Sequence, residues 1–164
     1  MQHLKIDGEL YKQLLINGAA NLSANYKAVD VLNVFPVPDG DTGTNMRMTI
    51  EAGANEIKNL EEKSIYEVAK KLSRGMLMGA RGNSGVILSQ FFRGIYKGLA
   101  GFKEVTAKEF GKAFLSGVDQ AYHAVMKPVE GTILTVAKDA SKKAYKLTKK
   151  TTSLEDFFKI LIDE

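Results

Sequence analysis

Two carboxylates stand one residue apart in the segment 33–45, which reads NVFPVPDGDTGTN. Asp39 and Asp41 offer the oxygen ligands that a hard divalent cation such as Mg²⁺ prefers, and that cation keeps positions open for water and phosphate oxygens. The spacing excludes an EF-hand, because counting Asp39 as position 1 puts Thr44 at the glycine position and Ile50 at the position of the bidentate glutamate. The pair therefore indicates half of a magnesium site.

The residues around the pair predict a stiff turn that opens into a helix. Pro36 and Pro38 have fixed φ angles and hold the residues before them in extended conformations. Gly43 allows the backbone to approach a ligand closely, and Thr44 or Asn45 is expected to be the N-cap of the following helix. A helix start attracts anions, so this turn could hold a metal and a phosphate together, although a rigid turn with an aspartate cap would show a similar pattern.

A second loop, residues 79–85 (GARGNSG), precedes another apolar helical segment. Its glycines permit a nest of backbone N–H groups that binds phosphate oxygens, with Asn83 or Ser84 as the cap. The loop is no Walker A motif, because the Lys-Ser/Thr pair is missing, and the helical segment before it excludes a Rossmann fingerprint. Taken alone, the glycine spacing fits close helix packing equally well.

A third loop, residues 127–134 (KPVEGTIL), also ends at a predicted helix start. Thr132 is expected to cap that helix, and Ile133 offers an apolar surface. Glu130 could contact a metal or a water, but residue type alone favours compensation of the helix dipole. His123 falls within a predicted helix beside Tyr122, where a packed or partly exposed histidine is commoner than a catalytic one.

The composition narrows the class of protein. With 164 residues and 45% hydrophobic content, one domain with one sizeable core is expected. The absence of cysteine excludes disulfides and cysteine-ligated zinc. A net charge of +4 comes from 23 basic and 19 acidic residues, and the lysines of segment 141–150 follow helical spacing, so we expect a solvated helix face and no nucleic-acid partner. Neither a signal peptide nor a transmembrane segment is evident, which predicts a cytoplasmic protein.

Helical periodicity dominates the chain, and no alternating strand pattern is evident. Asp7 is expected to cap a helix that ends near Ser23, and a short helix over 26–32 leads into the first loop. The inner face of the first helix would carry Leu10, Leu14, Leu15, Ala19 and Leu22. Capping boxes begin three later helices, at Ser64–Glu67, Thr106–Glu109 and Ser153–Asp156. With the breaks at 79–84 and 128–131, these signals predict eight helices.

The order of the breaks predicts where the three loops lie. In an up-and-down bundle consecutive helices are antiparallel, so alternate connections emerge at the same end. The loops at 33–45, 79–85 and 128–132 would connect helices two and three, four and five, and six and seven. We therefore expect an all-α, up-and-down antiparallel bundle or barrel of about eight helices with one site at one end.

Three segments in this order, 33–46, 79–90 and 127–138, resemble the N-terminal domain of bacterial fatty acid kinase A subunits. Those are DAK2-domain proteins, similar to the nucleotide-binding L subunit of dihydroxyacetone kinases, and the resemblance covers residues 1–164. It implies an eight-helix barrel that binds ADP or ATP and two Mg²⁺ ions at one end. The implied metal ligands are Asp39, Asp41 and, as the third position, Asn33. The implied nucleotide-binding residues are Thr42, Gly43, Thr44, Asn45, Gly82, Asn83, Ser84, Thr132 and Ile133.

The resemblance also implies a reaction and partners. The expected enzyme is a kinase that phosphorylates a fatty acid held by a separate DegV-like binding protein, giving an acyl phosphate, and the full-length protein would be a homodimer. The alternatives are a dihydroxyacetone kinase-type phosphotransferase subunit and a nucleotide-binding interaction module without turnover.

Two features depart from the family pattern. The dihydroxyacetone kinase L subunit uses three aspartates, whereas this chain has Asn33, with Asp30 upstream, so the third ligand is open. The chain also reaches Glu164 before the second glycine-rich segment that helps to enclose the adenine. We therefore expect a piece of a longer multidomain protein that is inactive by itself.

Overall fold

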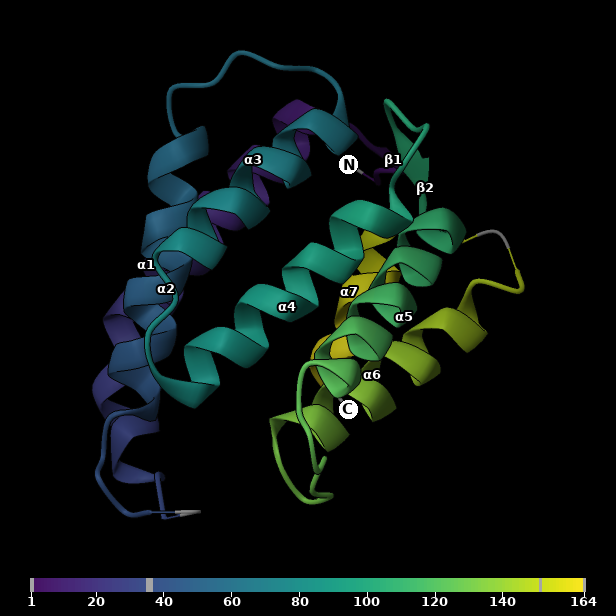
Figure 1. Ribbon diagram of the computed structural model, residues 1–164. Coiled ribbons are helices and arrows are strands. Elements are labelled where there is room, and N and C mark those ends of the chain that lie inside the picture. The colour runs from purple at the N-terminus through teal and green to yellow at the C-terminus, as the bar shows by residue number, and fades with distance from the viewer. Residues whose placement is uncertain (1, 35–36, 151, 164) are drawn as a thin grey trace.

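The computed structural model describes residues 2–34, 37–150 and 152–163 and is built almost wholly of helices (Figure 1). The helices are α1 (Gly8–Val31), α2 (Thr42–Ile57), α3 (Ile65–Met78), α4 (Gly82–Gly98), α5 (Ala107–His123), α6 (Ile133–Leu147) and α7 (Leu154–Asp163). Two short strands, β1 (Lys5–Ile6) and β2 (Val105–Thr106), pair antiparallel. The predicted all-α class is confirmed, while this two-residue pairing is too short to leave an alternating pattern in the sequence. Pro36 lies outside the described residues.

The first helix differs from the prediction. The break expected between Ser23 and the short helix over 26–32 is wrong, because α1 continues through it, and the described residues form seven helices rather than eight. The polar side chains that suggested a break have partners within the helical arrangement. Asn25 donates to the carbonyl of Asn21 one turn earlier (2.8 Å), and the hydroxyl of Ser23 donates to Glu51 on α2 (2.6 Å). Asn and Ser favour turns when their side chains bond nearby backbone groups in non-helical conformations; here the Asn25 bond follows the helical i to i−4 spacing and the Ser23 bond goes to another helix.

The helix starts that the sequence marks with local caps are confirmed. The capping side chains are Asp7, Ser64, Thr106, Thr132 and Ser153. Thr106 and Glu109 make both bonds of the capping box. At Ser64 the backbone N–H is taken by Glu62 instead (3.0 Å). These bonds satisfy orphan N–H groups and fix where each helix begins.

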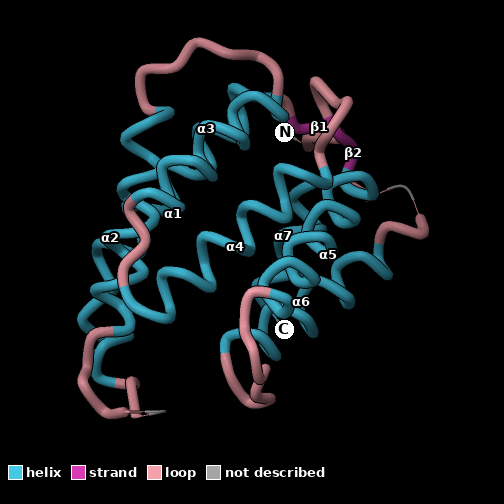
Figure 2. The backbone as a smooth tube through the Cα atoms, viewed as in Figure 1, coloured by secondary structure: helices cyan, strands magenta, loops and turns pink. Residues whose placement is uncertain are grey.

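The helices form two groups joined through α4. Figure 1 shows α1, α2 and α3 on one side, α5, α6 and α7 on the other, and α4 between them, with each later helix from α2 on in contact with the helix before it. The connections α1–α2, α3–α4 and α5–α6 lie toward the lower end, and the connections around 58–64 and 99–104 lie at the upper end (Figure 2). Because the first two expected helices are one helix, every later connection moves down by one in the count. The three loops become the first, third and fifth connections, which are still alternate connections, so they remain at the same end.

One hydrophobic core runs through both groups. Ile6, Leu72, Ile95, Phe110 and Phe157 are almost fully buried and come from β1, α3, α4, α5 and α7. Phe110 is the centre of edge-on aromatic contacts that reach α1, α5 and α7. The core therefore holds the helices that carry the three loops in fixed relative positions. None of the helices in the described ranges is long and apolar enough to cross a membrane.

Candidate functional site

The start of α2 is held by side chains of α1 and of the residues just after it. Asp30, in the last turn of α1, accepts hydrogen bonds from the backbone N–H (2.8 Å) and the hydroxyl (2.6 Å) of Thr44, and these bonds lower the pKa of the Asp30 carboxyl. Asn33 accepts from the N–H groups of Asp41 (3.1 Å) and Thr42 (3.3 Å). The expectation that Thr44 or Asn45 caps the helix is wrong, because α2 begins at Thr42 and its caps come from upstream.

Gly43 allows this close arrangement. A Cβ atom at that position would collide with the carbonyl oxygen of Tyr26 and with the Cβ of Val29, both on α1. Only the missing side chain lets the first turn of α2 rest on the last turns of α1, so Gly43 serves the close packing of two helices, and the expected approach to a ligand stays a prediction. The turn that carries the carboxylates is thereby attached to two helices.

Asp39 and Asp41 are exposed on this turn and face each other. A side-chain hydrogen bond with Asp41, partial loss of solvent and the charge of Asp41 raise the pKa of Asp39, in that order. Such a pair favours a bound cation, because a divalent ion removes the repulsion between the two carboxylates.

The rest of a metal shell would have to come from elsewhere. Within the described ranges no set of three or more acidic, histidine or cysteine side chains converges. The side-chain oxygen Oδ1 of Asn33, the expected third ligand, accepts two backbone N–H groups, and the Asp30 carboxylate accepts hydrogen bonds from Thr44. The donor set fits Mg²⁺, which binds through one or two carboxylates and completes its shell with water and phosphate.

The second loop lies against the first turns of α2. Gly82 has a left-handed conformation (φ 65°), and a Cβ there would collide with the side-chain nitrogen of Asn45. The hydroxyl of Ser84 contacts the carbonyl of Thr42 at 3.4 Å, the limit of a hydrogen bond. Residues from two predicted phosphate-binding segments, about forty positions apart in sequence, are therefore in contact.

The start of α4 has no side-chain cap. The helix begins at Gly82 with Arg81 in the N-cap position, and the side chain of Arg81 makes no capping hydrogen bond, so the expectation that Asn83 or Ser84 is the cap is wrong. The helices α1, α3, α5 and α6 all have such a cap. At a helix start without a side-chain cap, a bound anion can accept the hydrogen bonds of the unpaired backbone N–H groups.

Thr49 joins these two loops and was missed by the sequence analysis. Its side chain is fully buried, its hydroxyl donates to the carbonyl of Asn45 (2.7 Å) and it accepts from the N–H of Arg81 (3.1 Å). A Cβ at Gly85 would collide with the same hydroxyl. The only signal in the sequence is a threonine on the buried face of α2, and nothing local indicates its partner in the second loop.

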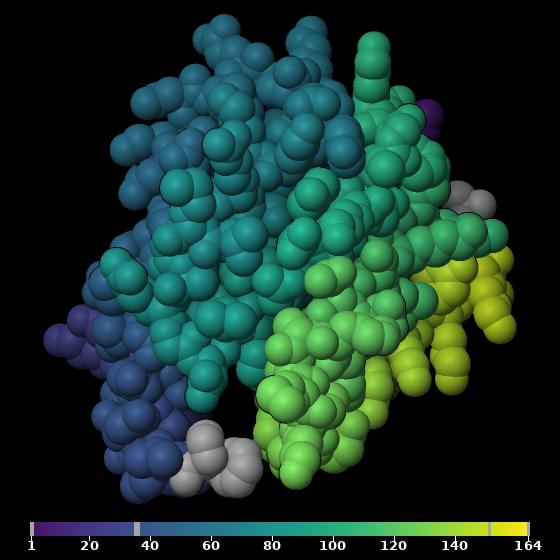
Figure 3. Space-filling model, in the orientation of Figure 1, coloured from purple at the N-terminus to yellow at the C-terminus, as the bar shows by residue number. Residues whose placement is uncertain are grey.

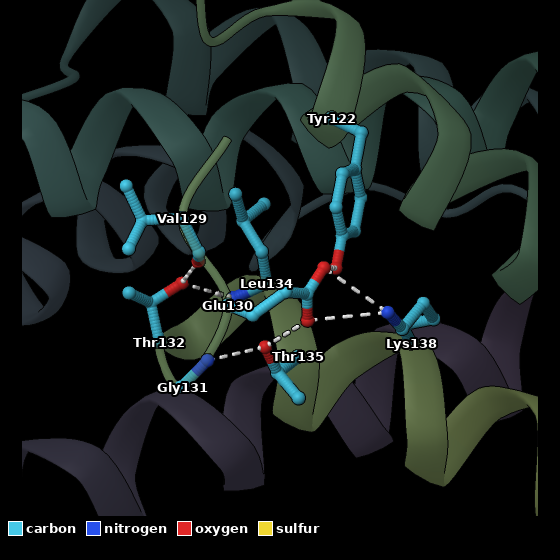
Figure 4. Close-up of polar contacts among 8 residues, drawn as sticks. All are labelled: Tyr122, Val129, Glu130, Gly131, Thr132, Leu134, Thr135 and Lys138. Carbon is cyan, nitrogen blue, oxygen red and sulfur yellow. Dashed lines mark hydrogen bonds and ion pairs between the residues drawn. The ribbon is translucent and has the colours of Figure 1, made fainter. Parts of the chain in front are cut away.

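The third loop lies at the same end and across from the first two, and Figure 3 shows the surface hollowed between the blue α1–α2 corner and the green α5–α6 corner. Thr132 is the N-cap of α6, as predicted, and accepts from the N–H of Leu134 (3.3 Å). Ile133 is the first residue of α6. Glu130 bonds Tyr122, Thr135 and Lys138 (Figure 4). The described geometry therefore gathers three helix starts and two carboxylates at one end.

The chain matches a known protein family and several relatives. The family that matches is the DAK2 domain, over residues 36–164. Protein YloV of Bacillus subtilis (strain 168) is 55% identical over 159 residues, which are 97% of this chain and 29% of that protein. An uncharacterized protein of Staphylococcus epidermidis is 59% identical over 140 residues (85% of this chain, 25% of that protein), and one of Staphylococcus haemolyticus is 54% identical over 160 (98% and 29%). The chain thus spans less than a third of the length of these relatives.

Proposed function

Because the chain belongs to the DAK2-domain family, we propose that the lower end of its helical bundle binds ADP or ATP together with Mg²⁺. DAK2 domains are kinase-associated nucleotide-binding domains. The observation that carries the proposal is the contact of Gly82 with Asn45, because it brings the carboxylate turn and the uncapped start of α4 to one place. A metal–phosphate complex needs those two features side by side.

Asp39 and Asp41 are the proposed metal ligands. A Mg²⁺ ion held by these carboxylates would supply positive charge to neutralise the negative charge that develops on the phosphate during transfer. Asn33 keeps the turn in shape by accepting the N–H groups of Asp41 and Thr42, and Asp30 does the same for Thr44. In this arrangement Asn33 and Asp30 orient the two aspartate ligands and do not bind the metal themselves.

The nucleotide phosphates would lie between the starts of α2 and α4. The proposed contacts are Thr42, Gly43, Thr44 and Asn45 from α2, Gly82, Asn83 and Ser84 from α4, and Thr132 and Ile133 from the start of α6. Backbone N–H groups at a glycine turn bind phosphate oxygens without a dedicated lysine. The chain would therefore bind and orient the phosphates, and such positioning, together with charge stabilisation, supplies most of the catalysis of phosphoryl transfer.

For the longer protein we propose a kinase that phosphorylates a fatty acid held by a DegV-like binding protein, with an acyl phosphate as product. The support is the resemblance of the three loops to those of fatty acid kinase A subunits. His123, at the end of α5, contacts the carbonyl of Asp119 within its own helix (2.8 Å). Acyl phosphate formation by the full-length protein, trapped with hydroxylamine, tests this proposal; formation of dihydroxyacetone phosphate, or no transfer at all, contradicts it.

Calorimetry with Mg·ADP tests the nucleotide site on this chain. We expect D39N and D41N each to lower the affinity at least about tenfold, the low end for changes at a metal site. The matched control is D139N, which removes an exposed carboxylate from α6. Thermal unfolding should show little change for either loop variant, because removing one of two facing carboxylates relieves repulsion. Undiminished Mg·ADP affinity in both variants would contradict the site.

A further inference from the structure

A network of side chains surrounds the carboxyl group of Glu130 in the third loop. Glu130 accepts hydrogen bonds from the hydroxyls of Tyr122 (3.1 Å) and Thr135 (2.6 Å) and from the ammonium of Lys138 (3.1 and 3.2 Å). These four residues are here called the Glu130 cluster (Figure 4). Tyr122 lies in the last turn of α5, and Thr135 and Lys138 lie in the first half of α6, so one carboxylate ties the end of one helix to the start of the next.

The cluster also reaches the backbone of the loop. The hydroxyl of Thr135, while it donates to Glu130, accepts from the N–H of Gly131 (2.8 Å). Gly131 is in the left-handed conformation (φ 81°), and the next residue, Thr132, donates its hydroxyl to the carbonyl of Val129 (2.8 Å). The turn that presents the start of α6 is therefore bonded on both sides, and the hydroxyl that holds the N–H of Gly131 is the one that Glu130 holds in place.

This arrangement differs from simple compensation of a helix dipole. A carboxylate that only compensates the dipole needs to lie near the helix start and bonds the first N–H groups. Glu130 instead bonds three side chains, and the ammonium of Lys138 lies 5.5 Å from the ring centre of Tyr122. The bonds from Thr135 and Lys138 lower the pKa of Glu130, and Glu130 raises the pKa of Lys138, so both groups stay charged near neutral pH.

We propose that Glu130 is a positioning residue for nucleotide binding. Through the Glu130 cluster it fixes the turn 129–132 and the start of α6. This holds Thr132 and Ile133 where they can border the nucleotide. This inference rests on the proposed function. Glu130 itself touches neither metal nor phosphate in this account; it acts through the conformation of the turn. The first two loops are joined by Thr49 and Gly82, whereas the third loop has its own fixed support.

Two measurements on the same variants test the inference. Hydrogen–deuterium exchange of the peptide 124–134 reports the turn without any ligand, and calorimetry reports Mg·ADP affinity. The variants are E130Q, K138M, K138R and the double variant E130Q/K138M. E104Q is the matched control, since it breaks an exposed carboxylate–lysine contact of similar length with Lys5 (3.2 Å) at the upper end.

We expect E130Q and K138M to speed exchange in this peptide and to lower Mg·ADP affinity about tenfold, while K138R keeps the pair and E104Q changes neither. The double variant should be no weaker than the weaker single variant, because both remove the same cluster. Unchanged exchange in E130Q, or faster exchange with unchanged affinity, would overturn the inference. Absence of Mg·ADP binding by the unchanged chain would overturn the proposed function instead, so the two failures are distinguishable.

Discussion

Replacement of Thr49 by valine is the sharpest test of how the first two loops are joined. Valine is β-branched like threonine and has nearly its shape, so T49V removes the hydroxyl with little change in side-chain volume. The hydroxyl accepts the N–H of Arg81 at 3.1 Å and donates to the carbonyl of Asn45 at 2.7 Å, within a side chain that is 0% exposed. The variant therefore separates the bond between the loops from the packing around it.

The magnitude follows from what each partner loses. The carbonyl of Asn45 lies inside α2 and keeps the helical N–H four residues on, so its loss is small. The N–H of Arg81 loses its partner, and an unsatisfied buried donor costs about 1–3 kcal/mol. Arg81 is itself exposed, so water replaces part of the bond, and we expect the low end of that range, about 1 kcal/mol. For a chain of this size that corresponds to a fall of about 2–4 °C in the unfolding midpoint.

Stability alone does not identify the role, so T49S is the control. Serine keeps the hydroxyl and loses one buried methyl group, which costs a similar amount, about 1 kcal/mol. Both variants should unfold earlier in a thermal scan. In calorimetry with Mg·ADP, T49V should bind more weakly because the loop 79–85 is no longer held against α2, and T49S should bind as the unchanged chain does. Equal nucleotide affinity in T49V and T49S would refute the reasoning.

Three further variants probe the loop contacts and the N-terminal segment. A Cβ at Gly82 would be strained by the φ of 65° and would also collide with the side chain of Asn45, whereas a Cβ at Gly101 (φ 87°) would meet nothing within 4 Å. G101A should therefore show only the backbone cost of about 1 kcal/mol. G82A should lose more stability and, by calorimetry, nucleotide affinity as well. Equal losses in the two variants would contradict the packing of Gly82 on Asn45. The side-chain and backbone bonds from His3 lower the pKa of Glu155 from 4.5 to about 2, so their stabilisation is complete above pH 4.5 and disappears as the pH falls toward 2. The unfolding midpoint of E155Q should therefore lie below that of the unchanged chain at neutral pH and approach it over this range; a gap that stays constant would show that the ionised carboxylate is not the cause.

Local signals in the sequence predicted most of the fold. The caps at Asp7, Ser64, Thr106, Thr132 and Ser153 lie within a few residues of the N–H groups that they bond, so residue type and spacing suffice to find them. The apolar face of the first helix was also correct: Leu15 and Ala19 are buried, and Leu10, Leu14 and Leu22 pack against the core. Alternation of connections placed the three loops at one end, because that argument needs only the order of the breaks.

Most of the errors have one physical cause, which is that the deciding partner is distant in sequence. The false break near Ser23 follows from a hydroxyl whose partner, Glu51, lies on another helix. The cap of α2 comes from Asp30 and Asn33, eight to fourteen residues upstream, and it could not be read from Thr44 or Asn45. Thr49 bonds a backbone group 32 residues away. Tertiary contacts of this kind leave no periodic trace, so the geometry of the site was less predictable than its location.

The antiparallel order of the helices places a condition on the site. The starts of α2, α4 and α6 meet at the lower end, but the ends of α1, α3 and α5 meet there too, and their dipoles have the opposite sign. At a distance these fields largely cancel, so attraction of an anion depends on N–H groups in direct contact and on local charge. The local charge includes Asp30, Asp39 and Asp41, which repel phosphate. A divalent cation at the two exposed carboxylates reverses that sign, and we therefore expect ADP without Mg²⁺ to bind this end of the bundle far more weakly than Mg·ADP.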